Sequence, residues 1–226
     1  MPVISLASSK GGAGKTTACI VLGTIISETA SVTIIDADPA QRLVRWSKKR
    51  ELPKSITIIA DTNEDTIMDT IAEAQSRSDI VMIDLEGVFS RLNTFALLRS
   101  DLVIVPMAKE QQDADDAVLT LAQIKRDGMS ARREIPARIL FSRTKAAVPS
   151  NLEKEIHAAM SANVPCLENE LIGRTAYSNL HSRGGTLRDL KKDGEVRGVD
   201  KAIDNAMAVA KEVYQILEDG LRHAAE

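Results

Sequence analysis

One short run near the start of the chain combines glycines, lysines and threonines in an order suited to binding phosphates. The run reads Ser8-Ser9-Lys10-Gly11-Gly12-Ala13-Gly14-Lys15-Thr16-Thr17. Glycines let the backbone turn tightly and point successive N–H groups at phosphate oxygens, and the apolar-periodic stretch that follows adds the positive end of a helix. The run therefore predicts a phosphate-binding loop whose backbone is supplied by Gly11, Gly12, Ala13 and Gly14.

Three side chains of this loop have distinct expected roles toward a bound nucleotide. Lys15 supplies positive charge to the β and γ phosphates, and Thr16 offers its hydroxyl to Mg²⁺. Thr17 is expected to reach the α-phosphate. The loop thus predicts a nucleoside triphosphate and Mg²⁺ as cofactors.

Two aspartate-bearing segments follow apolar runs farther along the chain. Residues 31–39 end in Asp36-Ala37-Asp38-Pro39, and residues 79–84 lead through four apolar positions to Asp84. An aspartate after a strand commonly starts a turn, so either segment alone is weak evidence. Together, and in this order after a phosphate loop, they predict that Asp84 holds Mg²⁺, directly or through water.

The phosphate loop departs from the strict pattern G-x-x-x-x-G-K-[ST], because Ser9 stands where that pattern has glycine. The form KGGxGKT, with the additional Lys10, is the deviant Walker A box, and the chain resembles the ParA/MinD superfamily of ATPases. It looks closest to small ParA-type partition ATPases or VirC-type ATPases. The resemblance extends to residues 171–177 and to the pair Gly184-Gly185.

This resemblance implies roles that the spacing of residues does not. ATP is the expected nucleotide, and Lys10 is expected to touch the phosphates across a nucleotide-sandwich homodimer, where a cation can stabilise charge on the leaving group. Asp38 matches the residue that positions the attacking water, and Asp36 the residue near the Mg²⁺ shell. Hydrolysis of ATP to ADP and phosphate follows as the expected activity.

Two segments differ from most members of the superfamily. After Asp84 the chain continues Leu85-Glu86-Gly87 rather than with a Pro-Pro turn, so Glu86 adds negative charge near the nucleotide. Ser142 stands where relatives often carry the asparagine that holds adenine. Arg143, beside it, is expected to stack on the base.

Resemblance also implies nonspecific binding of double-stranded DNA by the ATP-bound dimer, release after hydrolysis and stimulation by a ParB-like protein. Such a cycle would segregate or position plasmid or chromosomal DNA. The candidate DNA-binding residues are Arg174, Arg183, Arg188, Lys191 and Lys192, with Arg197 and Lys145 near them. An equally basic rival cluster comprises Arg42, Arg45, Lys48, Lys49 and Arg50. Interspersed acidic residues leave a solvated mixed-charge face as an alternative for the first cluster.

The elements that must position these residues follow from the alternation of short β-branched runs with amphipathic stretches. This alternation predicts an α/β fold with one doubly wound, mostly parallel sheet and helices on both faces, within a single P-loop ATPase domain spanning residues 1–226. Strands are expected at residues 3–7, 32–36, 56–60, 80–84, 102–106, 138–142 and 164–167. Helices are expected at residues 15–28, 63–76, 91–99, 114–125, 151–161 and 200–221, the last with one apolar stripe that packs on the body.

Composition narrows the alternatives. A 44% apolar and 27% charged chain of 226 residues is typical of a globular protein, and a net charge of −3 argues against a dedicated, tight DNA-binding domain. The two cysteines and three histidines are scattered and predict neither a zinc site nor the cysteine pair of an iron-sulfur reductase. The acidic last helix disfavours a MinD-like membrane-binding protein.

We expect a cytoplasmic bacterial protein, nucleoid-associated if it binds DNA, with no membrane partner and no separate operator-binding domain. A VirC-type ATPase that assists conjugative DNA transfer remains open beside a partition ATPase.

Substituting Lys15 tests the phosphate loop directly. Because Lys15 supplies the loop's charge to the β and γ phosphates, Lys15→Ala is expected to abolish nucleotide binding in calorimetric titrations. Normal ATP affinity in this variant would remove the assignment.

Overall fold

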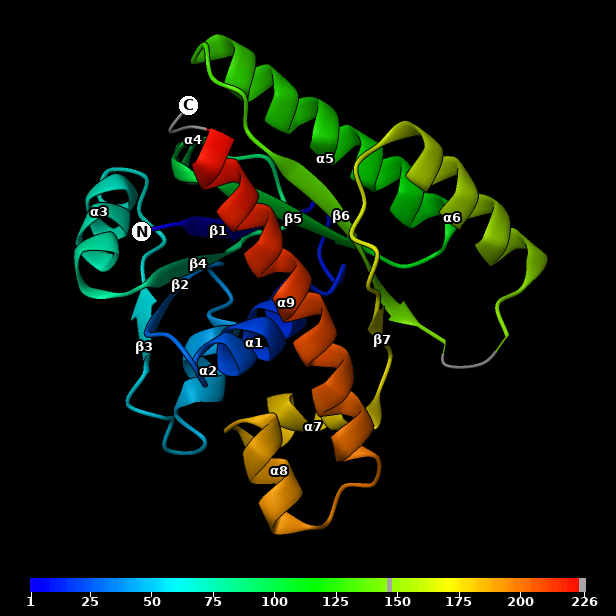
Figure 1. Cartoon of the computed structure of the whole chain (residues 1–226). Coiled ribbons are helices and arrows are strands. Elements are labelled where there is room, and N and C mark those ends of the chain that lie inside the picture. Colours follow the sequence, from blue (N-terminus) through cyan, green and yellow to red (C-terminus); the bar gives the residue numbers. More distant parts are fainter. Residues whose placement is uncertain (146–147, 224–226) are drawn as a thin grey trace.

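The computed structural model describes residues 1–145 and 148–223, which form a seven-stranded sheet between two layers of helices (Figure 1). The strand order is β3-β2-β4-β1-β5-β6-β7, and every neighbouring pair is parallel. The strands are β1 (Val3–Leu6), β2 (Val32–Ala37), β3 (Ile56–Ala60), β4 (Ile80–Leu85), β5 (Leu102–Met107), β6 (Ala137–Thr144) and β7 (Leu171–Ile172). The predicted fold class, a doubly wound parallel sheet, is confirmed.

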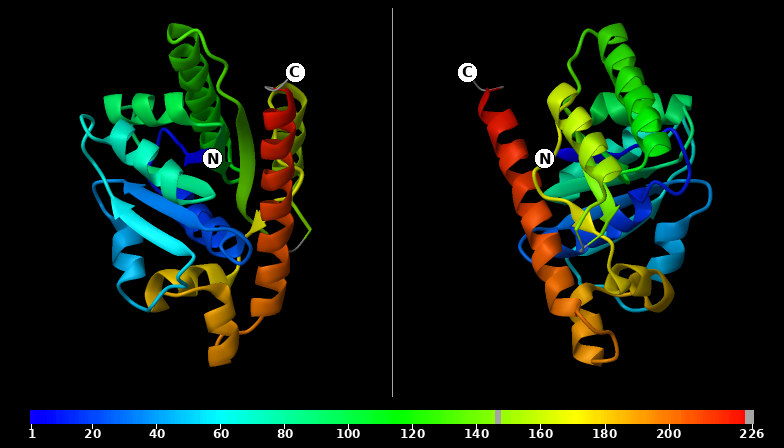
Figure 2. Two further views of the ribbon diagram at one scale, coloured as in Figure 1. Left: turned by 60° about the vertical axis from the view of Figure 1, so that its left-hand side comes forward. Right: turned by 90° about the vertical axis from the view of Figure 1, so that its right-hand side faces the viewer.

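Helices cover both faces of this sheet (Figure 2). One face is packed by α1 (Lys15–Ile26), α2 (Arg42–Ser47), α7 (Thr175–Arg183), α8 (Leu187–Asp193) and α9 (Val199–His223). The other is packed by α3 (Ile67–Arg77), α4 (Arg91–Arg99), α5 (Gln111–Ser130) and α6 (Asn151–Asn163). Burial on both faces explains why β1, β2, β4 and β5 are buried along their whole length and apolar at most positions.

The last helix docks on the body, as its apolar stripe predicts. Ile203, Ala206, Val213 and Leu217 of α9 are buried in the core that α1 shares. Met207, which lies at helical spacing from Ile203, is 46% exposed. Ala202 and Val209 are fully buried as well, so the buried face of α9 is rotated away from Met207 rather than narrowed.

The prediction of a strand at residues 164–167 is wrong. Cys166 forms only an isolated bridge with Ile139, because Pro165 has no N–H to donate to a ladder. The chain is then held by Glu212 of α9, whose carboxylate accepts the N–H groups of Glu168 and Asn169 at 2.6 and 2.9 Å. The last strand, β7, forms five residues later beside the end of β6.

Three short helices, α2, α7 and α8, were not expected from the sequence. They have six, nine and seven residues, so each offers few repeats of the helical period, although α4 was predicted at the same length as α7. Local capping defines α8, where Thr186 and Asp189 form a reciprocal capping box. Helix α5, in contrast, is longer than the 114–125 expected and runs from Gln111 to Ser130.

None of the helices within the described residues is long and apolar enough to cross a membrane. Cys19 is buried, whereas Cys166 is only partly buried.

Candidate nucleotide site

The phosphate loop lies at the point where the strand order of the sheet reverses. Strand β1 stands between β4 and β5, and the loop follows its carboxyl end. Parallel α/β sheets bind ligands at this edge, outside the carboxyl ends of the strands. Asp36 and Asp84, near the ends of β2 and β4, are direct register partners and so lie side by side, with Asp84 next to β1.

The loop backbone is open on one side and tightly packed on the other. Gly11 and Gly12 are exposed, and no atom lies within 4 Å of the position where either would carry a Cβ. Gly14 caps α1 in a left-handed conformation, with φ 103°, that side chains disfavour. Gly87 backs onto the loop so closely that a Cβ there would lie 2.5 Å from the backbone carbon of Lys10. Glycine at position 87 thus allows the segment after β4 to pack directly against the backbone of the loop.

Asp84 contacts the first turn of α1. Its Oδ2 accepts a hydrogen bond from the Thr16 hydroxyl at 2.7 Å, which joins the expected magnesium ligands across 68 residues of sequence. Burial raises the pKa of Asp84 to about 7, although the hydrogen bond from Thr16 opposes this shift. Burial also raises the pKa of Asp36, against the hydrogen bond that its Oδ2 accepts from the N–H of Val44.

These carboxylates fit a hard divalent cation. In the described part of the chain, Asp36 Oδ1 and Asp84 Oδ1 are buried without a hydrogen-bond partner. No group of three or more His, Cys, Asp or Glu side chains within that part could hold a metal by itself. Mg²⁺ commonly takes only one or two protein oxygens and completes its shell with water and phosphates. The donor set of Thr16 with Asp84 is therefore suited to Mg²⁺ carried by a nucleotide.

Lys15 is buried within the loop, at 6% exposure, and its Nζ donates to the backbone oxygen of Lys10 at 3.1 Å. Burial lowers the pKa of its ammonium, while Asp84 and Asp38 act in the opposite direction. A positive charge is thus held inside a curled backbone, where the anionic phosphates of a nucleotide would stabilise it.

Lys10 lies on the other side of the loop and is tied to α5. Its Nζ forms ion pairs with Asp113 and, at 3.3 Å, with Asp116. The hydrogen bond that its ammonium donates to Asp113 raises the pKa of Lys10. Asp113 is only 4% exposed and also pairs with Arg143 at 3.0 Å. In this single chain, the expected cross-subunit lysine therefore has intramolecular partners.

Asp38, Ser142 and Arg143 are held by other contacts. Asp38 pairs with Arg42 at 2.9 Å, at the start of α2, and accepts the N–H of Ala40 at 2.8 Å. Ser142 is buried, and its hydroxyl donates to the carbonyl oxygens of Ala13 and Met107 at 3.3 and 3.4 Å. Ser142 therefore contacts the phosphate loop itself, and the exposed Arg143 beside it adopts a left-handed backbone with φ 56°.

Sequence reasoning missed two residues that contact this site. Asp113 binds Lys10 from a position 103 residues away, and His181 binds Thr17 from 164 residues away. Asp113 is in the first turn of α5, where an acidic residue is ordinary. His181 is a lone histidine in a short helix. Neither carries a local signal that could have identified its partner.

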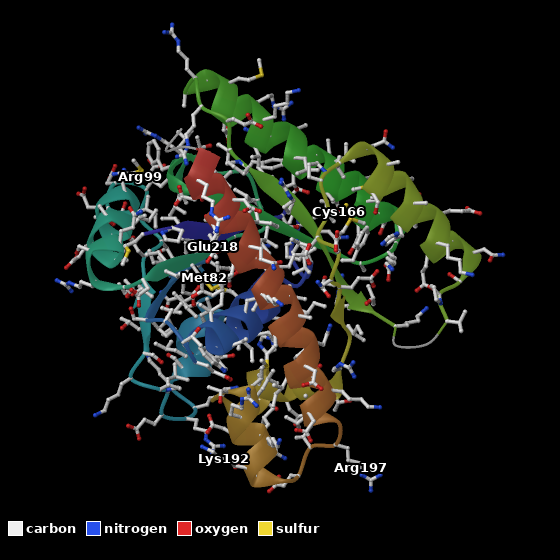
Figure 3. All side chains as sticks on the ribbon, viewed as in Figure 1. Met82, Arg99, Cys166, Lys192, Arg197 and Glu218 are labelled. Carbon is white, nitrogen blue, oxygen red and sulfur yellow. The ribbon has the colours of Figure 1, made fainter. Side chains whose placement is uncertain are left out.

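The two basic clusters, separate in sequence, form one surface. Lys49, just after α2, donates to the backbone oxygen of His181 in α7, and Arg50 pairs with Asp193 of α8 at 2.7 Å. Many of the candidate cations are paired with acids: Arg183 with Glu195, Arg188 with Glu28, and Lys191 with Asp200. Those that are exposed and lack an ion pair within the described residues are Arg45, Lys48, Lys49, Lys192 and Arg197. Of these, Lys49 is held by the backbone oxygen of His181. Lys192 and Arg197 lie at the end of the molecule formed by α8 and the loop before α9 (Figure 3).

The sheet and its phosphate loop define a P-loop nucleotide-binding protein. The VirC1 protein family matches residues 1–223, and the chain belongs to this family within the ParA/MinD superfamily of ATPases. It is 37% identical over 225 residues to Protein ParA of Rhizobium radiobacter, covering 98% of this chain and 100% of the relative. It is 25% identical over 231 residues to Protein virC1 of Rhizobium rhizogenes, covering 96% and 100%.

Solved structures share the fold. A plasmid partition protein from Borrelia burgdorferi bound to AMPPNP aligns with a TM-score of 0.70 at 17% identity, covering 95% of this chain and 98% of that one. MinD from Pyrococcus horikoshii in complex with Mg-ADP aligns with a TM-score of 0.70 at 17% identity, covering 94% and 95%.

The buried carboxylate of Asp84 is expected to destabilise the nucleotide-free fold while serving Mg²⁺ binding. Asp84→Asn removes a buried charge and is expected to raise the free energy of unfolding of the nucleotide-free protein at pH 8 by about 1–3 kcal/mol, while weakening Mg²⁺-dependent nucleotide binding. Between the usual aspartate pKa and about 7, folded wild type holds a proton that the unfolded chain has lost, so its stability falls as pH rises. The advantage of the variant should therefore shrink from pH 8 to pH 5.

Chemical denaturation at both pH values measures this effect. Asp65→Asn, at an exposed aspartate, is the matched control and should change stability little at either pH. A destabilised Asp84→Asn protein at pH 8 would contradict the prediction.

Proposed function

We propose that this chain is a ParA-like ATPase that cycles between an ATP-bound, DNA-binding dimer and a released form. In this cycle ATP and Mg²⁺ bind at the phosphate loop, Lys10 reaches the phosphates of a second copy, and hydrolysis ends DNA binding. The cycle segregates or positions plasmid or chromosomal DNA. A ParB-like partner stimulates hydrolysis.

The ATPase part of the proposal is supported by the cluster at the strand ends. Thr16 with Asp84 would hold Mg²⁺, and Lys15 would neutralise the β and γ phosphates. Asp38 would orient the attacking water once its pairing with Arg42 is relaxed. Mg²⁺, when bound, supplies the charge that stabilises phosphoryl transfer.

The observation that carries the DNA-binding part is the joining of two basic clusters beside α2. This helix begins four residues after Asp38, so the surface and the site share one short segment. Exposed cations without acidic partners are free to contact DNA phosphates and release counterions. We assign this contact to Arg45 of α2 and Lys48 directly after it, with Lys192 and Arg197 near α8.

The first experiment measures binding to a nonspecific DNA duplex with ATP, ADP or no nucleotide, at several salt concentrations. ATP-dependent binding that weakens as salt rises is the expected result. Absence of binding in every state would contradict the DNA-binding cycle and leave a MinD-like positioning ATPase that acts without DNA.

Charge reversal then tests the surface. Arg45→Glu with Lys48→Glu, or Lys192→Glu with Arg197→Glu, should lower DNA affinity about tenfold or more and reduce the salt slope by about 2. The matched control is Arg99→Glu with Lys125→Glu, which makes the same charge change on α4 and α5 over the opposite face of the sheet. Equal losses in the control pair would indicate a general charge effect and contradict this surface.

Lys10 tests the dimer. Because its ammonium is expected to act across the interface, Lys10→Ala should retain ATP binding but lose ATP-dependent dimerisation in sedimentation. Lys54→Ala, at an exposed lysine, is the control and should dimerise normally. An unchanged dimer fraction in Lys10→Ala would contradict the sandwich arrangement.

The match to the VirC1 family favours a second candidate, an ATPase that assists conjugative DNA transfer. Deleting the gene distinguishes the two candidates. A partition ATPase predicts faster plasmid loss with normal transfer, whereas a transfer ATPase predicts lower transfer frequency with normal inheritance.

A further inference from the structure

One contact that has no part in the proposed function connects the phosphate loop to the basic surface. Thr17 Oγ1 and His181 Nε2 lie 2.8 Å apart, so the first turn of α1 is hydrogen-bonded to α7. We propose that His181 is a positioning residue that transmits occupation of the α-phosphate position to the α2–α7–α8 junction, formed by Trp46, Lys49, Gly184 and Gly185. This proposal rests on the nucleotide binding proposed above.

The coupling follows from the chemistry of a hydroxyl, which has one proton to donate. Burial lowers the pKa of His181, and the nearby charges of Lys49 and Arg42 act in the same direction. The imidazole is therefore neutral near pH 7 and carries one N–H. Thr17 can give its proton either to Nε2 or to a phosphate oxygen. When a phosphate takes it, His181 must present an N–H at Nε2 or lose the contact, so the two events depend on each other.

His181 is attached to the junction by its backbone as well as its ring. Its carbonyl oxygen accepts from Lys49 Nζ, just beyond α2. Three residues later, a Cβ at Gly184 would lie 2.7 Å from Lys49 Cβ and 3.0 Å from the backbone nitrogen of Arg50. Such close packing prevents α7 from shifting without moving the end of α2.

Helix α2 has its own, separate connection to the site. Val44 donates to Asp36, and Arg42 pairs with Asp38. Because Asp38 is expected at the attacked γ-phosphate, this route should respond to ATP alone. The route through Thr17 and His181 should respond to ADP and ATP, because both carry the α-phosphate.

Trp46 provides a probe of the junction. It is the single tryptophan of the chain, is 1% exposed, and donates from Nε1 to the backbone oxygen of Gly185 at 3.2 Å. A shift between α2 and the α7–α8 connection therefore changes the environment of the only indole. Its fluorescence reports that shift without DNA or a second protein.

The experiment titrates Mg-ADP and Mg-ATP into wild type, His181→Phe and His181→Gln, recording Trp46 emission and measuring affinity by calorimetry. We expect ADP to change the emission of wild type. His181→Phe, which has no hydrogen-bonding group, should lose most of this response while its ADP affinity changes by about fivefold or less, within the usual size of a coupling. His181→Gln, which keeps a polar terminal group, should restore at least part of the response.

His157→Phe is the matched control, because His157 is a half-exposed histidine of α6 that stacks on Phe141. It should respond as wild type does. If His181→Phe does not fold, Thr17→Val, which removes only the hydroxyl, should show the same loss of the ADP response. An ADP response in either variant equal to that of wild type would overturn the proposal.

The failure of the proposed function gives a different result. If calorimetry detects no nucleotide binding by wild type, both proposals are wrong. If wild type binds ADP with no change in Trp46 emission, the coupling is wrong and nucleotide binding stands.

Discussion

Burial of two neighbouring carboxylates, Asp36 and Asp84, is the constraint around which this structure is organised. Parallel pairing of β2 and β4 places them side by side, and Leu6 of β1 stands next to Asp84. Ionised groups in such a place are costly unless a cation accompanies them. The N–H of Val44, the hydroxyl of Thr16 and the charge of Lys15 offset only part of that cost. A site that binds Mg²⁺ with a nucleotide would supply the rest.

Lys10 likewise requires partners of opposite charge. In the single chain its ammonium is satisfied by Asp113 and Asp116, so moving to the phosphates of a second copy means exchanging one set of acidic partners for another. Asp113 would keep Arg143 and the N–H of Ala108 after that exchange. Dimerisation would then depend on whether Lys10 pairs with the aspartates of its own chain or with the phosphates of the ATP bound to the second copy.

Helix α2 explains how a small site could control a larger surface. It is anchored to the site by Asp36 and Asp38 at its start, and it ends against α7 and α8. Six residues are too few to bend independently of those anchors. Arg45, one of the exposed cations of the basic surface, thus lies on a helix whose two ends are held by the nucleotide site and by the junction.

The sequence by itself determined the features that lie within a few residues of one another: the phosphate loop, the aspartates near the ends of β2 and β4, and the alternation that specifies a parallel sheet. These could be predicted because a tight glycine turn or a buried strand leaves its mark on neighbouring residues. Prediction from the sequence failed at residues 164–167, where Pro165 and the distant Glu212 determine the course of the backbone. It also failed to identify α2, α7 and α8. Only the tertiary structure decided that Lys10 meets Asp113, that Thr17 meets His181, and that two basic clusters form one surface. Such contacts depend on where helices dock, and docking is decided by packing across the whole core rather than by any local pattern.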